Sequence, residues 1–180
     1  EVIFAGWSTT KNIDSSAGLF FSNLISIEEL NLDANDFVFV PGREHTLNII
    51  KDNKHFLSFL KQWNERGVNI CSICVGIFWL AESGLIAGKR STTHWKYLDL
   101  LEKNYPETSV QKDNLFIIEN NLYMSAGVSS GIDLSLHILE QLFDYNLTLQ
   151  VSKEFVNYLR RAGGDPQLSN FLKYRNHIDS

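Results

Sequence analysis

Cysteine and basic residues are both scarce in this chain. The 180 residues include two cysteines, which is too few for a disulfide framework and typical of intracellular thiols. The predicted strand end between Cys71 and Cys74 points them away from each other, which disfavours a C-x-x-C redox pair. Lysine and arginine total 16 against 21 acidic residues, for a net charge of −5. The basic residues are scattered, so the chain lacks the clustered basic face of a DNA-binding domain.

Long apolar runs, targeting signals and cofactor motifs are also absent from the sequence. No apolar run reaches the roughly 18 residues that a membrane-spanning helix needs. Residues 1–10 show neither a basic region nor a signal-peptide cleavage pattern. There is no Walker loop, no G-x-G-x-x-G, and no cluster of histidine, cysteine and carboxylate residues at metal-ligand spacing. We therefore expect a cytoplasmic protein that uses no metal or cofactor and binds no membrane.

The composition and the pattern of the chain indicate one globular α/β domain. Hydrophobic residues make up 44% and charged residues 21% of the sequence, which suffices for a sizeable core. Short β-type runs alternate with helical periods, and this alternation predicts a mostly parallel sheet covered on both faces. The predicted strands are 1–7, 18–23, 35–42, 68–73, 90–94 and a hairpin over 115–127 that turns at 120–121; the predicted helices are 46–66, 75–83, 96–105, 132–143 and 149–159.

Cys74 occupies the junction between a buried strand and a helix. Ligands bind parallel sheets at the carboxyl ends of the strands, and Cys74 follows one of these ends directly. A nucleophile at such a turn has a strained backbone and needs small neighbours, one of which is Gly76. The N–H groups of the following helix are expected to lower the thiol pKa and favour the thiolate. The alternative interpretation is that Cys74 is a buried cysteine that contributes only to core packing.

Two other strand ends bring polar groups to the same edge of the sheet. His94 lies at the end of a predicted strand. A neutral imidazole near a thiol can act as a base or hydrogen-bond partner, and this is one interpretation of His94. The alternative is that His94 has only a structural role. The turn at Gly42 exposes backbone N–H groups that, together with the N–H of Val75, could hold an oxyanion or a carboxylate. Arg43, Glu44 and His45 are equally consistent with a solvated turn.

The fourth strand end is the small-residue loop 125–133. It allows a ligand to approach the backbone closely, but it is also an ordinary connection from a strand to a helix. Ser129 or Ser130 is the expected N-cap of that helix.

The sequence resembles the PfpI/ThiJ superfamily, also called class I glutamine amidotransferase-like, in two segments: SICVGIFWLAESGLIAGKRSTTHW and LYMSAGVSSGIDLSLHILE. The resemblance is greatest to the branch that forms the N-terminal domain of AraC-family transcriptional regulators, and it runs from about Val38 to about Leu172. The end of the chain, LRRAGGDPQLSNFL, is similar to the segment that precedes the DNA-binding part of those regulators. The resemblance implies a flavodoxin-like three-layer α/β sandwich with a mostly parallel sheet and a cysteine nucleophile elbow, and usually a homodimer.

The same resemblance implies site residues and domain limits. It matches Cys74 to the elbow cysteine and His94 to the neighbouring histidine. The ligand-binding positions would be Gly42, Arg43, Val75, Gly76, Trp95, Ala126, Gly127 and Val128. The domain would occupy 1–172, and 173–180 would begin a linker toward a C-terminal DNA-binding domain outside this chain.

The sequence departs from the family pattern at three places. The family begins with a strand and helix that carry an acidic partner for the cysteine, and we expect this unit to be missing from residues 1–180. Hydratases of the family that act on isonitriles commonly have threonine after the cysteine, where this chain has Val75. The usual Pro-Gly-Gly turn is Pro41-Gly42-Arg43, and the Arg43 side chain could crowd an oxyanion hole or attract an anionic ligand.

Two functions are consistent with these residues. In the preferred one, the domain binds a small-molecule effector over Cys74, dimerises, and controls a helix-turn-helix module outside the chain, which alone contacts DNA. The alternative is a stand-alone cysteine-dependent hydrolase, hydratase or amidase resembling isonitrile hydratase. The regulator-like tail and the replaced threonine and glycine favour the first function.

Overall fold

A four-stranded sheet forms the centre of the computed structural model, which describes residues 1–7, 12–15, 17–43, 45–157 and 159–169. Its strand order is β5-β6-β10-β9, with β5, β6 and β10 parallel and β9 antiparallel to β10. The strands are β5 (Phe37–Val40), β6 (Asn69–Ile73), β9 (Phe116–Glu119) and β10 (Leu122–Ser125). The predicted hairpin is confirmed, and Asn120 at its turn has a φ of 57°. Asparagine tolerates this left-handed conformation better than most residues.

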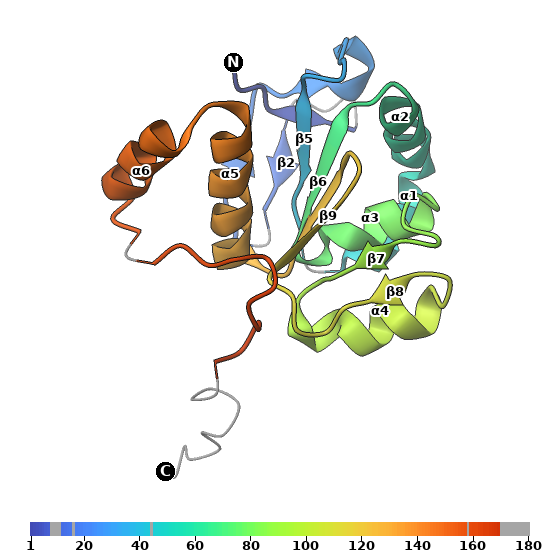
Figure 1. The fold of residues 1–180 in the computed structure, drawn as a ribbon. Helices are drawn as coiled ribbons and strands as arrows, with labels where there is room; N and C mark the ends of the chain where they lie inside the picture. The colour runs from blue at the N-terminus through green and yellow to red at the C-terminus, as the bar shows by residue number, and fades with distance from the viewer. Residues whose placement is uncertain (8–11, 16, 44, 158, 170–180) are drawn as a thin grey trace.

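Helices cover both faces of this sheet (Figure 1). One face carries α1 (Thr46–Asp52), α2 (Lys54–Glu65) and α3 (Ile77–Glu82). The other face carries α5 (Val128–Leu142), with α6 (Tyr145–Glu154) packed against α5. The predicted three-layer α/β sandwich with a mostly parallel sheet is therefore confirmed.

The alternation of β6 divides the core between the two faces. Ile70 belongs to the larger cluster under α2 and α3, and Cys71 belongs to the smaller cluster under α5. Both side chains are fully buried. The first cluster includes the buried side chains of Trp79, Phe78, Leu60, Ile77, Leu80 and Met124. Since each strand residue serves one face, the near-continuous apolar run of β6 is what a strand buried on both faces requires.

Short elements surround the central sheet. Strand β1 (Ala5–Gly6) pairs with β4 (Ile25–Ser26), β2 (Ile13–Asp14) with β3 (Phe20–Phe21), and β7 (Arg90–Ser91) with β8 (Ser109–Val110). Helix α4 (Leu98–Asn104) follows a single turn η3 (Trp95–Tyr97), and η1 (Ile27–Glu29) follows β4. The predicted strands 1–7, 18–23 and 90–94 were therefore too long, since two-residue pairs stand in their places.

Side-chain caps explain where the helices differ from their predicted limits. The predicted helix 46–66 breaks at Asn53, whose backbone leaves the helical region and whose amide donates to Ile49 O over 2.9 Å. Helix α6 begins at Tyr145 because the Asp144 carboxylate accepts from the Leu147 N–H over 2.8 Å. Helix α5 begins at Val128, ahead of the predicted start.

The predicted domain end at 172 and the linker 173–180 lie outside the described residues. No helix among the described residues is long and apolar enough to cross a membrane.

Candidate functional site

Cys74 lies at a sharp elbow between β6 and the helical turn that leads into α3. Its φ is 56°, in the left-handed region that residues with a side chain seldom adopt. The next turn, η2 (Cys74–Gly76), brings Gly76 against the end of β5. A Cβ at Gly76 would lie 2.2 Å from Val40 O, so only glycine fits there. The predicted strand–cysteine–helix elbow is therefore confirmed, and its strain is held by tight backbone packing.

The electrostatics of the elbow differ from the prediction. Burial raises the pKa of the Cys74 thiol, and the hydrogen bond from the Val75 N–H offsets only part of this increase. The predicted lowering of this pKa is wrong. The reason is that Cys74 is partly buried, while the segment that follows it is a single turn and a six-residue helix with a weak dipole. The thiol is therefore protonated near neutral pH.

His94 lies in the loop that faces the elbow, and it caps η3. Its Nδ1 accepts a hydrogen bond from the Lys96 N–H over 3.3 Å, which assigns the proton of the neutral ring to Nε2. The ring stacks on Trp95 at a centroid distance of 5.6 Å. Burial and the charge of Lys96 lower the pKa of His94. The imidazole is therefore neutral at physiological pH.

One hydrogen bond ties the His94 loop to the elbow. Thr93 Oγ1 donates to Cys74 O over 2.9 Å, so the two loops meet as the sheet topology predicts. Among the hydrogen bonds of the described residues, none joins the His94 ring to the Cys74 sulfur. The structure thus places the two loops together without a formed thiol–imidazole pair.

The Gly42 turn packs directly against the elbow. A Cβ at Gly42 would lie 2.8 Å from Val75 Cγ2 and 2.9 Å from Val75 N, so the turn can approach only as glycine. The next residue, Arg43, is fixed through its backbone, since Thr46 Oγ1 donates to Arg43 O over 2.5 Å. Its Nε is buried and has no hydrogen-bond partner among the described residues.

The loop after β10 approaches the site from the other side. Gly127 is the N-cap of α5, and a Cβ there would lie 3.6 Å from His94 Cδ2. Ser130 occupies the third helical position, where its hydroxyl accepts from the Gly127 N–H over 2.6 Å. The predicted serine N-cap is therefore replaced by Gly127, with Ser130 bonding back to it. Ala126 is buried, whereas Val128 is 80% exposed.

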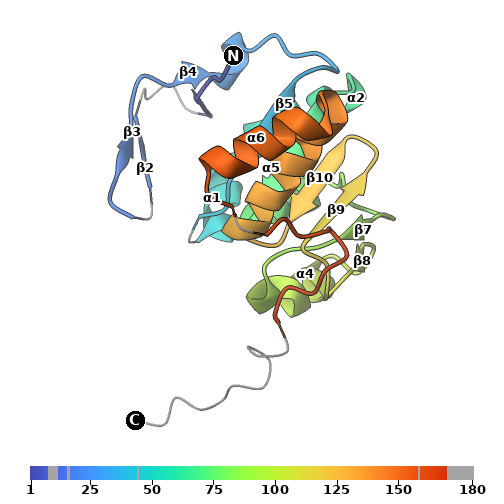
Figure 2. The same cartoon turned by 60° about the vertical axis from the view of Figure 1, so that its left-hand side comes forward.

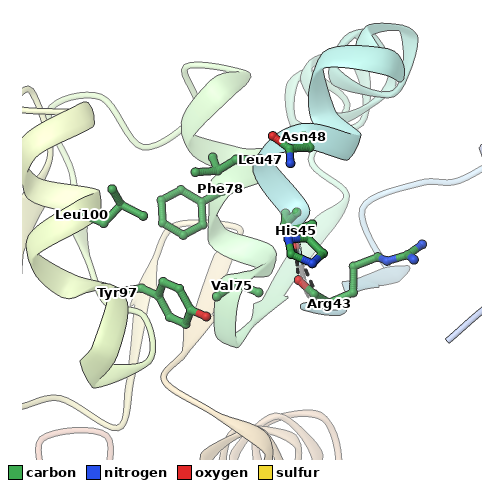
Figure 3. A pocket seen from close by; sticks show the side chains of 9 residues that line it. Arg43, His45, Leu47, Asn48, Val75, Phe78, Tyr97 and Leu100 are labelled. Atoms are coloured by element: carbon green, nitrogen blue, oxygen red, sulfur yellow. Dashed lines mark hydrogen bonds between the residues drawn. The ribbon is translucent and has the colours of Figure 1, made fainter. Parts of the chain in front are cut away.

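A cavity of about 290 Å³ opens beside the elbow (Figure 3). Figure 3 shows Phe78, Tyr97 and Leu100 along one side of it and His45 across from them, while the Arg43 side chain points away from Tyr97. Its lining residues are Arg43, His45, Thr46, Leu47, Asn48, Val75, Phe78, Tyr97 and Leu100. This volume, with an apolar wall and a few polar groups, suits a small organic molecule.

The cavity includes residues that the sequence prediction missed. Of the predicted ligand-binding residues, only Arg43 and Val75 line it. Tyr97 was missed, and His45 was considered only as part of a solvated turn, although both belong to loops at the carboxyl edge. In the part of the chain that the structure describes, no group of three or more histidine, cysteine or carboxylate residues could hold a metal ion.

Comparisons with known proteins assign the chain to a family. The DJ-1/PfpI family model matches residues 1–141. The chain belongs to the DJ-1/PfpI family. A ThiJ/PfpI family protein from Pseudomonas syringae shares its fold at a TM-score of 0.77 and 21% identity, over 94% of this chain and 66% of that one.

Two curated relatives of this DJ-1/PfpI chain have different functions. The HTH-type transcriptional regulator CdhR from Pseudomonas aeruginosa is 34% identical over 125 residues, which cover 69% of this chain and 36% of the regulator. Isonitrile hydratase from Pseudomonas putida is 28% identical over 136 residues, which cover 76% of this chain and 57% of the hydratase. The chain thus spans only part of the length of either relative.

Proposed function

We propose that this DJ-1/PfpI chain is the small-molecule-sensing domain of an AraC-type transcriptional regulator. The observation that carries the proposal is the match to the regulator CdhR at 34% identity over 69% of the chain. The site supports binding over catalysis, because burial raises the pKa of the Cys74 thiol and His94 does not bond to it. An effector would occupy the cavity beside Val75, with Tyr97 and His45 across it.

The proposal assigns effector binding and DNA binding to different domains. The net charge of −5 fits a part that does not itself contact phosphate. DNA would be bound by a C-terminal helix-turn-helix module, in a homodimer whose two-fold symmetry matches a bipartite operator. The effector would act by binding one of two states of the domain more tightly than the other.

The mass of the native protein in its source cell tests this proposal first. A product that continues past Ser180 into helix-turn-helix sequence is the expected result. A product extended only at its N-terminus, by one strand and one helix, would contradict the regulator proposal.

Effector binding is tested by melting shifts of the 180-residue chain against a panel of small metabolites. We expect a stabilising metabolite whose shift is lost in Tyr97→Ala, since Tyr97 lines the cavity and is 38% exposed. Tyr145→Ala is the matched control, because Tyr145 is 61% exposed on α6 and does not line the cavity. A shift that survives Tyr97→Ala would place the effector elsewhere.

A second candidate function is a cysteine-dependent hydratase, which the match to isonitrile hydratase favours together with the strained elbow at Cys74. It requires turnover of an isonitrile that disappears in Cys74→Ser. We expect no such turnover, because the thiol is protonated near neutral pH and position 75 is valine. Turnover by the unmodified chain that Cys74→Ser abolishes would establish the enzyme instead.

A further inference from the structure

The chain after α6 crosses the molecule and is tied to it at three places. We call residues 160–167 the strap. In Figures 1 and 2 this red segment leaves α6, passes the lower end of α5 and continues toward the C-terminus. Its contacts reach α5, the start of β9 and the loop that holds His94. The strap therefore contacts the His94 loop and leads directly to the end of the described chain.

The first tie is an ion pair between the buried carboxylate of Asp133 on α5 and Arg161, whose side chain is 32% exposed. Asp133 is 2% exposed, and its carboxylate accepts from Arg161 Nη2 over 2.6 Å, from Arg161 Nε over 2.9 Å and from the Arg161 backbone N–H over 3.0 Å. Arg161 also donates to Ser129 Oγ over 3.0 Å, and Arg160 pairs with Glu140. These contacts hold the beginning of the strap against α5.

The second tie is a close approach of backbone to backbone. Gly163 O accepts from the Leu115 N–H over 2.8 Å. A Cβ at Gly163 would lie 2.7 Å from Phe116 O, so the strap seats there only as glycine. Nothing lies within 4 Å of a Cβ built on the adjacent Gly164. The two neighbouring glycines therefore differ sharply in their surroundings.

The third tie reaches the loop that holds His94 and contacts the elbow. The side-chain amide of Gln167 donates to Thr93 O over 2.9 Å and to Thr92 Oγ1 and Asn114 O over 3.2 Å each. Thr93 in turn donates to Cys74 O over 2.9 Å. Two hydrogen bonds through one residue thus connect the strap to the elbow, and His94 is the next residue of the same loop.

We propose that docking of the strap and the state of the Cys74–His94 site are coupled through Gln167 and Thr93, so that the strap transmits a change at the site toward the C-terminus. This inference rests on the proposed sensing function, because it names the element that carries the signal. The first two ties would suffice to hold the strap in place. The third adds a contact to the Thr92–His94 loop, which is itself hydrogen-bonded to the elbow. Coupling of this kind is reciprocal, so a change at either end must be visible at the other.

Undocking the strap tests one direction of the coupling. Gly163→Ala is expected to undock it and to speed trypsin cleavage after Arg161. The same variant is expected to raise the rate at which iodoacetamide labels Cys74 by about fivefold, because the Thr92–His94 loop loses a restraint. Gly164→Ala is the matched control and is expected to change neither rate. Faster cleavage with unchanged labelling of Cys74 would overturn the proposal.

Cys71 distinguishes a local effect from general opening, because it is fully buried in β6. If Cys71 is also labelled faster in Gly163→Ala, the Gln167→Ala variant distinguishes a local effect from general opening. This variant removes the third tie and leaves the first two. It is expected to raise Cys74 labelling about fivefold without labelling Cys71. Gln150→Ala on α6 is its control, since Gln150 is exposed. Unchanged labelling of Cys74 in Gln167→Ala would overturn the coupling.

Occupying the site tests the other direction. Iodoacetamide places a carbamidomethyl group on Cys74 when the thiolate sulfur displaces iodide and the thiol proton passes to solvent. Trypsin cleavage after Arg161 is expected to change about fivefold in the modified chain, and to stay unchanged in Cys74→Ser treated in the same way. An unchanged rate in the modified chain would contradict the coupling. None of these measurements uses an effector, so their outcome tests the coupling independently of the metabolite screen and of the native mass.

Discussion

At the residue scale, the elbow is a strained cysteine held between glycines. Cys74 keeps its left-handed backbone because Gly76 and Gly42 bring the ends of β5 and β6 closer than any side chain would permit. The same close packing removes water from the sulfur and raises the pKa of the thiol. Geometry typical of a nucleophile thus coexists with electrostatics that suppress the thiolate.

The reactivity of Cys74 is expected to increase with pH well beyond neutrality. Folding raises the pKa of the thiol, so the reactive thiolate is scarce at pH 7 and accumulates only in alkaline solution. Iodoacetamide labelling followed by mass spectrometry between pH 6 and pH 10 measures this. A labelling rate that has already levelled off below pH 7 would show a poised thiolate and contradict the expectation.

Gly76→Ala is expected to destabilise the chain by about 2–3 kcal/mol, because its Cβ would lie 2.2 Å from Val40 O and the backbone of the elbow would have to move. Urea unfolding followed by circular dichroism measures the loss. Gly164→Ala is the control and should change stability by less than about 0.5 kcal/mol, since its Cβ meets open space. Equal stability of the two variants would show that the elbow is not tightly packed.

At the element scale, polar caps decide where helices begin, and buried faces decide where they pack. Asp144 starts α6 and Gly127 with Ser130 starts α5, at positions earlier than the apolar periodicity suggests. Helix α3 is short but buried almost all round, with Phe78 and Trp79 in the larger core cluster. The elbow therefore rests on a helix that is anchored by packing rather than by its own length.

Asp144→Ala is expected to cost about 1 kcal/mol of stability, because the Leu147 N–H loses its capping carboxylate. Asn146→Ala, an exposed change in the same helix, is the control and should have little effect. Thermal unfolding of both variants measures the difference. An equal melting temperature for the two would mean that the cap contributes nothing to α6.

Phe78→Ala is expected to lower the free energy of unfolding by about 3–5 kcal/mol. The Phe78 residue is 1% exposed and belongs to the larger core cluster, which α3 packs against. Phe155→Ala is the matched control, because Phe155 is 72% exposed. Chemical denaturation of both variants compares the two losses. A Phe78 variant as stable as the Phe155 variant would show that α3 presents a different face to the core.

At the scale of the whole molecule, four loops lie at the carboxyl edge of the sheet, and the strap connects one of them, the His94 loop, to the C-terminal end of the described chain. The cavity, the elbow and the His94 loop all lie at the carboxyl ends of the strands, as parallel topology requires. The chain has a net charge of −5, and this acidic balance suits a domain whose role is not contact with phosphate. Sensing and DNA contact therefore belong to separate parts in the proposed regulator.

The 180-residue chain by itself is expected to bind DNA more weakly than about 10⁻⁴ M at physiological salt, the weak limit of non-specific binding. Fluorescence anisotropy with a labelled duplex measures this. The native protein, if it carries the proposed helix-turn-helix module, is the comparison and should bind tightly. Salt-dependent micromolar binding by the chain alone would contradict the separation of sensing and DNA contact.

The sequence by itself determined the features that depend on neighbouring residues. The apolar run of β6 followed by Cys74 and Gly76 predicted the elbow, and the Asn120–Asn121 turn predicted the hairpin. Alternating strands and helices predicted the layers of the sandwich. These signals are local, since a turn or a strand is specified by the residues it contains.

Only the tertiary structure decided the features that depend on distant residues. The direction of the Cys74 pKa shift follows from how deeply other loops bury the sulfur. Tyr97 joins the cavity because its ring, in η3, packs edge-on against Phe78 of the elbow helix. Gln167 meets Thr93 across 74 positions of the chain. No local pattern encodes such contacts, because burial and long-range hydrogen bonds exist only after the layers have packed.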